Sequence, residues 1–204
     1  AVCSVNATTY YWVGGTGSIV ANTATTAWST VGVGGAATGS AVTPTNADVF
    51  IFDGTDISST AGPQTGAVTF SLSTSITVGQ IILQNGAVVT YGNTSSGRNI
   101  TFGGSVAGDD FVVNSGCTFT ASGSTLVLAI GTGTTGSVSG AVILGAGANS
   151  QSFTVADASG LIVNSGGSIE TKSNIAPFGT SGTANVVVFA SGSTSTNCVS
   201  SIPF

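Results

Sequence analysis

Short runs of apolar residues recur along most of the chain and are separated by Gly, Ser, Thr and Asn. Many of these apolar residues are β-branched, a side-chain type enriched in strands. A Val-, Ile- and Thr-rich chain broken repeatedly by Gly reads as short strands joined by tight turns. The pattern predicts an all-β protein with almost no helix.

A weak internal repeat is visible in the second part of the chain, over residues 82–90, 112–120 and 162–170. Each copy has two aliphatic residues, two polar turn residues, a Gly, two variable residues and an apolar residue. The Asn-Gly or Ser-Gly step at the turn supplies a residue that tolerates a positive φ. The repeat predicts strand, corner, strand, and we expect the aliphatic residues on either side to point into a common core.

The spacing of the corner glycines bears on the architecture, because Gly86, Gly116 and Gly166 are 30 and 50 residues apart. Hairpins of a β-sandwich favour turn signals every ~8–12 residues. Solenoid rungs contact only their neighbours and tolerate irregular insertions. The sequence therefore predicts a parallel β-helix, or β-solenoid, with a β-sandwich as the alternative. Residues 1–66 are expected to form an N-terminal capping block and residues 67–204 the solenoid body of the same domain.

The N-terminal block is rich in aromatic residues, and Tyr10, Tyr11, Trp12 and Trp28 are its candidate functional side chains. Large apolar side chains at the end of a stack can cap the first rung and shield its open edge. The same aromatic rings are also the candidate contacts for a glycan. Capping is the favoured role.

Charge is scarce, since 4% of residues are Asp, Glu, Lys or Arg, compared with about 25% in typical soluble domains. The basic residues are Arg98 and Lys172. Binding to nucleic acid requires several basic side chains on one face, so the composition excludes it. No apolar stretch approaches the ~20 residues of a membrane-spanning helix, and we expect no membrane insertion.

The titratable residues do not form a recognisable catalytic or metal-binding set. The chain has no His, which removes Ser-His-Asp, Cys-His and the usual zinc arrangements. Adjacent Asp109 and Asp110 would point to opposite faces of a strand, unlike the facing carboxylates of a glycosidase. The spacing of Asp48, Asp53 and Asp56 fits neither an EF-hand nor a calcium-binding nonapeptide repeat. We expect no catalytic residue, cofactor or metal site, and hence no enzyme activity.

Three cysteines are present, and Cys3 and Cys198 are the disulfide candidates. Cys117 lies within a repeat and is expected to be a small buried residue. A straight solenoid of roughly six to eight rungs separates its ends by about 30–40 Å, whereas a disulfide requires Cα atoms within about 7 Å. The bond would then join subunits stacked head to tail. In a fold whose termini meet, such as a sandwich, it would be intramolecular.

The order of motifs in the N-terminal block resembles that of a known group of surface proteins. The motifs are the segment 10–17 (YYWVGGTG), Trp28, a Gly-Gly step at 34–35 and the segment 44–53 (PTNADVFIFD). They cover about a quarter of the chain. They resemble the opening of repetitive β-solenoid, adhesin-like surface proteins secreted by Bacteroidetes-type bacteria. That resemblance implies secretion, a β-helical body and a role in adhesion or surface architecture.

The leading functional expectation is a non-enzymatic extracellular structural protein. It would be a self-assembling filament or surface-coat subunit with an adhesive role, associating head to tail outside the cell or at its surface. The chain begins at Ala1 and contains no Met, which fits a mature product after removal of a signal peptide.

The alternative expectation is a monomeric β-solenoid module that binds surface glycans or ice. An ice-binding face would repeat a Thr-x-Thr triplet on successive rungs, and residues 118–120 (TFT) form one such triplet. The aligned residues 88–90 (VVT) and 168–170 (SIE) interrupt this ladder.

Overall fold

The computed structural model describes residues 7–14, 17–20, 28–32, 35–39, 42–55, 67–93, 97–145, 150–172, 175–179 and 183–197. Within these ranges the chain forms strands and turns and contains no helix. The strands belong to three sheets, named here sheet 1, sheet 2 and sheet 3.

Sheet 1 consists of β1 (Thr9–Trp12), β3 (Trp28–Ser29), β4 (Val49–Asp53), β7 (Gln80–Gln84), β10 (Phe111–Val113), β13 (Gly136–Val138), β16 (Leu161–Val163) and β18 (Val187–Phe189). Sheet 2 consists of β2 (Gly17–Val20), β5 (Ala67–Leu72), β8 (Val88–Asn93), β11 (Thr118–Ala121), β14 (Ala141–Leu144), β17 (Ser168–Thr171) and β19 (Thr194–Asn197). Sheet 3 consists of β6 (Ile76–Val78), β9 (Arg98–Phe102), β12 (Thr125–Ile130) and β15 (Ser150–Val155).

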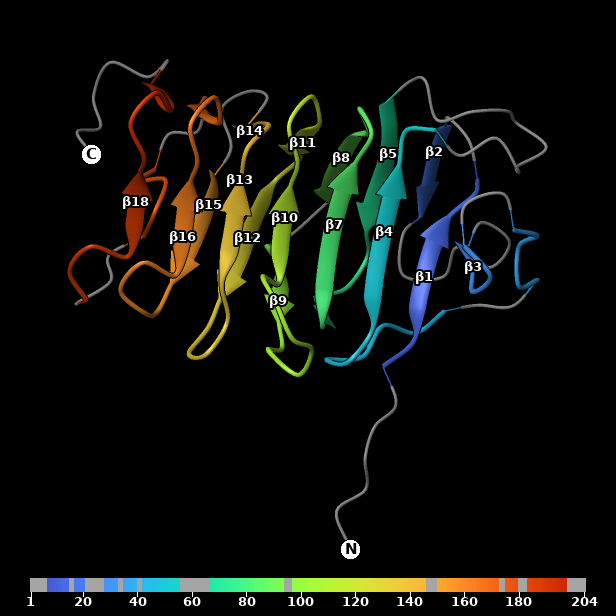
Figure 1. The fold of residues 1–204 in the computed structure, drawn as a ribbon. Coiled ribbons are helices and arrows are strands. Elements are labelled where there is room, and N and C mark those ends of the chain that lie inside the picture. Colours follow the sequence, from blue (N-terminus) through green and yellow to red (C-terminus); the bar gives the residue numbers. More distant parts are fainter. Residues whose placement is uncertain are drawn as a thin grey trace, which may run out of the picture.

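The chain winds through the three sheets in turn, and each strand pairs in parallel with its counterpart one rung earlier. Four rungs contribute a strand to all three sheets: β4–β6, β7–β9, β10–β12 and β13–β15. The strands of sheet 1 stand side by side from β1 to β18 across the front of the molecule (Figure 1). The predicted parallel β-solenoid is confirmed, and the β-sandwich alternative is wrong.

Rung length varies along the stack, as the positions that follow one another in sheet 1 show. Phe50, Ile81, Phe111, Gly136, Leu161 and Val187 occupy equivalent positions. The successive intervals are 31, 30, 25, 25 and 26 residues. The 50-residue gap between Gly116 and Gly166 therefore contains two short rungs rather than one long insertion.

The corners have the backbone conformation that the repeat predicts. Gly86, Gly116 and Gly166 have positive φ values of 79°, 79° and 81°, a conformation that glycine adopts without steric cost. The rung that the repeat missed turns more sharply, with only Ser139 and Gly140 between β13 and β14. A Cβ atom on Gly140 would lie 2.4 Å from backbone carbonyl oxygens of the preceding rung, so only glycine fits there.

The interior is filled by the alternate side chains of each strand. Leu83, Val113 and Val163 are fully buried in the core. Their neighbours Ile82, Val112 and Ile162 stand on the outer face of sheet 1, and Ile162 is 37% exposed. The expectation that both aliphatic residues of each repeat point inward is therefore wrong for the first of the pair, because successive strand residues face opposite sides.

Candidate functional site

The N-terminal end of the stack is closed by an aromatic cluster. Trp12 and Trp28 are 3% and 4% exposed, and their rings meet edge to face with centroids 5.1 Å apart. The short strand β3 places Trp28 there by pairing antiparallel with β1. The Trp28 ring also meets Phe50 at 5.0 Å and Phe52 at 5.5 Å, and Tyr10 stacks on Phe50 at 5.3 Å. The chain thus fills its first rung with rings.

Tyr11 lies apart from this cluster. It pairs with Ile51 in the register of sheet 1 and is half-buried on the outer face. Of the four aromatic residues singled out in the sequence, the structure brings together Tyr10, Trp12 and Trp28 and places Tyr11 on the opposite side of the sheet.

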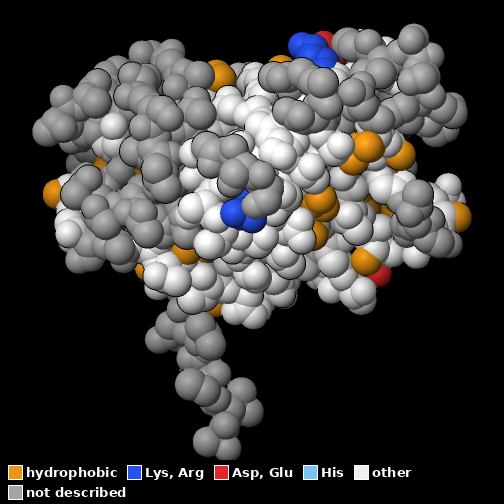
Figure 2. Space-filling model, turned by 180° about the vertical axis from the view of Figure 1, so that it is seen from behind, with side chains coloured by type: hydrophobic (Ala, Val, Ile, Leu, Met, Phe, Trp, Pro, Cys, Tyr) orange, Lys and Arg blue, Asp and Glu red, His pale blue; other side chains and the backbone are white. Residues whose placement is uncertain are grey.

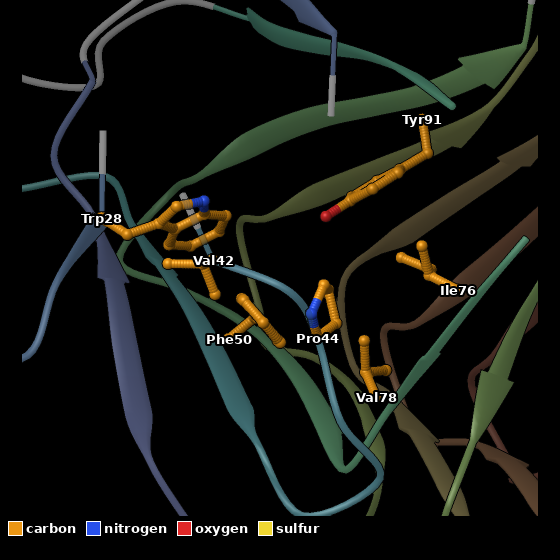
Figure 3. Close-up of a pocket in the computed structure, with 7 residues that line it drawn as sticks. All are labelled: Trp28, Val42, Pro44, Phe50, Ile76, Val78 and Tyr91. Atoms are coloured by element: carbon orange, nitrogen blue, oxygen red, sulfur yellow. The ribbon is translucent and has the colours of Figure 1, made fainter. Parts of the chain in front are cut away.

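A small apolar hollow of about 290 Å³ lies beside the cluster (Figure 3). Its lining consists of Trp28, Val42, Pro44, Phe50, Ile76, Val78 and Tyr91. The phenol oxygen of Tyr91 points into the hollow, and burial raises the pKa of this side chain. Typical ligand pockets occupy about 300–1,000 Å³ and combine an apolar wall with several convergent polar groups. This hollow provides one such group and is best described as a gap in the packing of the first complete rung.

The carboxylate of Asp53 joins two rungs at a corner. It accepts hydrogen bonds from the backbone N–H and hydroxyl of Thr55, at 2.8 and 2.6 Å. The side-chain amides of Gln84 and Asn85 donate to its other oxygen from the next rung, at 2.7 and 2.8 Å. Burial by itself would raise the pKa of Asp53, but these hydrogen bonds outweigh burial and lower it. All the acceptor capacity of Asp53 is used in holding the corner.

The other candidate carboxylates of the N-terminal block show no shared site. Asp48 accepts hydrogen bonds from the backbone N–H and hydroxyl of Thr45, at 2.9 and 2.8 Å, which makes these two residues a turn motif. Asp56 lies outside the described residues.

Asp109 and Asp110 occupy contrasting environments at the start of β10. Asp109 is exposed and accepts a hydrogen bond from the Thr135 hydroxyl at 2.7 Å. Asp110 is 2% exposed; one of its oxygens accepts from the Thr135 backbone N–H at 2.9 Å, and the other is buried without a hydrogen-bond partner. Burial and the neighbouring charge of Asp109 raise the pKa of Asp110. The two carboxylates share a partner at a corner and do not face each other across a cleft.

Within the described ranges, no three His, Cys, Asp or Glu side chains gather in a group that could hold a metal ion. Cys117 is a free thiol, 1% exposed, and burial raises its pKa. Cys3 and Cys198, the disulfide candidates, lie outside the described residues.

The C-terminal end of the stack differs from the N-terminal end. β18 and β19 are the last strands of sheets 1 and 2 in the described part of the chain. Phe178, Asn185, Val186, Val187, Phe189 and Ser195 line an open hollow of about 780 Å³ there. The Phe189 ring is 38% exposed and meets Phe178 edge to face at 6.1 Å. Sequence reasoning missed this end, although the run Val187–Phe189 repeats the aliphatic pattern of the earlier corners.

The outer faces of sheets 2 and 3 are mostly polar and carry few charges (Figure 2). On sheet 2 one outward column reads Thr90, Thr120, Ile143, Glu170, Thr196 in register. Glu170 forms an ion pair of 3.1 Å with Lys172 beside it. On sheet 3 the corresponding column reads Thr77, Thr101, Ala129, Thr154.

These features define the chain as a three-sheet parallel β-solenoid with one closed and one open end. Comparison of the chain with models of protein families, with curated proteins and with solved structures finds no match. In the described ranges, no helix has the length and apolar character needed to cross a membrane.

Proposed function

We propose that this chain is a non-enzymatic extracellular structural protein that assembles head to tail into a filament or surface coat. The observation that carries the proposal is the open C-terminal end. There the apolar interior of the solenoid reaches the surface at Phe189 and Val187, and the last strands present backbone groups along their free edges. Exposed strand edges are templates for pairing with another chain.

The strand directions favour continuation of the stack by a second copy. Sheet 2 begins with β2 and ends with β19, and its strands are parallel throughout. A copy displaced along the solenoid axis would therefore place its β2 beside β19 with the parallel direction preserved. Such a contact joins two different surfaces and does not close on itself, which is the geometry that produces filaments.

The low charge supports the same proposal. Between β11 and β15 no side chain carries a charge, so successive subunits would bury little charge at their junction. The extracellular location and the adhesive role are supported by the resemblance of the N-terminal motifs and by the Ser- and Thr-rich outer faces. An intermolecular Cys3–Cys198 bond would add a covalent lock to each junction.

Negative-stain electron microscopy of the full chain, with and without reductant, tests this proposal. We expect regular fibres, and we expect Phe189→Lys to abolish them, because a charge at the edge opposes strand pairing. Thr120→Lys is the matched control, since it places the same charge on an outer face and should leave the fibres intact. Dispersed particles of the wild-type chain under both conditions would refute the filament. Fibres that survive Phe189→Lys would show that the open end is not the junction.

A second candidate function, a monomeric module that binds glycans or ice, is favoured by the threonine columns. Thr90 and Thr120 are outward neighbours on sheet 2, and Thr77 and Thr101 lie in one column of sheet 3. Ile143 and Glu170 interrupt the first of these columns. Monomeric behaviour combined with thermal hysteresis, or with retention on a polysaccharide matrix, would favour this function over the filament.

A further inference from the structure

The outer face of sheet 1 carries a continuous apolar column that the core does not use. In register along the seven parallel strands, the outward side chains are Tyr11, Ile51, Ile82, Val112, Ser137, Ile162 and Val188. These side chains are half-buried or, for Ile162, exposed. Partial exposure is expected in such a ladder, because neighbours about 4.8 Å away on each side cover part of every residue.

Figure 1 shows the strands of sheet 1 at the front of the molecule, facing the viewer. Their sequences are apolar at successive positions, as in Leu161–Val163 and Val187–Phe189. Strands with apolar residues on both faces are typical of sheets covered on both faces. The outward columns of sheets 2 and 3 are instead dominated by Thr. Sheet 1 is thus distinguished from the other two sheets by its outer surface.

We propose that the outer face of sheet 1 is a lateral interface with a second copy of this chain, separate from the end-to-end junction. No side chain in the column is charged, so two copies can bring these columns together without burying a charge. Both copies repeat at the same ~4.8 Å rung spacing, which lets their side chains interdigitate along the whole column. The face is therefore self-complementary, as a two-fold symmetric interface requires.

The size of the face sets the expected strength of the contact. Six intervals of ~4.8 Å give a length of about 29 Å, and five residues of ~3.3 Å give a width of about 16 Å. Two such faces bury roughly 900 Å² together, between the ~800 Å² that most crystal contacts do not reach and the ~1,200 Å² at which stable interfaces begin. A weak, reversible dimer is expected. Along a filament the same face would recur in every subunit and the contacts would add; this consequence alone rests on the proposed function.

Sedimentation equilibrium of the Phe189→Lys variant tests the inference, because blocking the open end leaves only the lateral contact. We expect a concentration-dependent dimer. Adding Val112→Lys should raise its dissociation constant by about tenfold or more, since an unpaired charge would be buried at the centre of the face. Adding Thr120→Lys, in the same rung but on sheet 2, should leave the constant unchanged. A monomer at all concentrations, or equal weakening by both substitutions, would overturn the inference.

A cross-linking measurement keeps the test sharp if Val112→Lys disturbs the fold. Val112 is the fourth of seven positions, so it meets its own copy whether the two columns run in the same or in opposite directions. Val112→Cys, in a background with Cys3→Ser and Cys198→Ser, should form dimers with a short bis-maleimide, whereas Thr120→Cys should not. Equal cross-linking of the two variants would contradict the lateral interface. Loss of fibres without loss of this dimer would refute the filament alone.

Discussion

Phe111 stands at the middle of the stack, and its removal is the clearest test of how the rungs hold together. The side chain is fully buried on the fourth of the seven parallel strands of sheet 1. Its ring meets Phe119 at 5.1 Å, Phe102 at 5.6 Å and Phe153 at 5.7 Å, so it contacts rings from both other sheets. Phe111→Ala therefore opens a cavity where the three sheets converge.

The expected cost follows from these contacts. Truncating a buried Phe to Ala costs about 3–5 kcal/mol, and aromatic pairs add roughly 0.5–1.5 kcal/mol each beyond burial. With three ring contacts and no exposure, we expect Phe111→Ala to cost about 4–5 kcal/mol, a large part of the ~5–15 kcal/mol of a typical domain. Phe189→Ala is the matched control. That ring is 38% exposed with one ring contact to Phe178, and it should cost about 1–2 kcal/mol.

Guanidinium unfolding monitored by circular dichroism and by tryptophan fluorescence measures both the cost and its distribution. Trp12 and Trp28 report on the N-terminal end, whereas circular dichroism reports on all three sheets. Because each rung contacts only its neighbours, weakening the middle rung should separate the two transitions. Coincident transitions with a cost below about 2 kcal/mol, or a cost equal to that of Phe189→Ala, would refute the assignment of Phe111 as the centre of the core.

Two further predictions concern the corners. Gly140→Ala should cost at least ~3 kcal/mol, because its Cβ would meet two rigid backbone carbonyls, whereas Gly116→Ala should cost only the ~1–2 kcal/mol of a left-handed conformation; thermal unfolding compares them. Asp110 has a folded-state pKa raised above its ordinary value of 3.8, so its contribution to stability is complete below that pH and is lost as pH rises through the folded-state pKa. Relative to wild type, Asp110→Asn should therefore be more stable at pH 7 than at pH 3. Asp53, whose pKa is lowered, contributes stability above pH 3.8 that is lost as pH falls, so Asp53→Asn should show the opposite trend in melting temperature. Parallel pH trends for the two variants would contradict both assignments.

The fold class could be predicted because the corners have local requirements. Gly86, Gly116 and Gly166 each follow a polar residue and adopt a positive φ, which is a property of a few adjacent residues. The rung that begins at Gly136 was missed because Gly140 is required by carbonyls of the previous rung. That requirement depends on the rung spacing and leaves no local motif.

The candidate surfaces were less accessible to sequence reasoning than the corners. In a strand as short as Leu161–Val163 all residues are aliphatic, so alternation does not reveal that Ile162 faces outward. Pairing register alone assigns it to the column that includes Val112. The open end was also hidden, because Phe178 reaches the end of the core only through the backbone hydrogen bond from the Phe153 N–H to the Pro177 carbonyl.

The short intervals between equivalent positions, 25 to 31 residues, set an order in which the protein is built. A ribosome adds that many residues in about 1–6 s, at roughly 5–20 residues per second. Local β-structure forms within microseconds, so each rung can dock on a finished template before the next one emerges. The ring-filled first rung is the earliest template. The end that carries Phe189 is always the last to form, so a growing chain presents its adhesive edge only when the body behind it is complete.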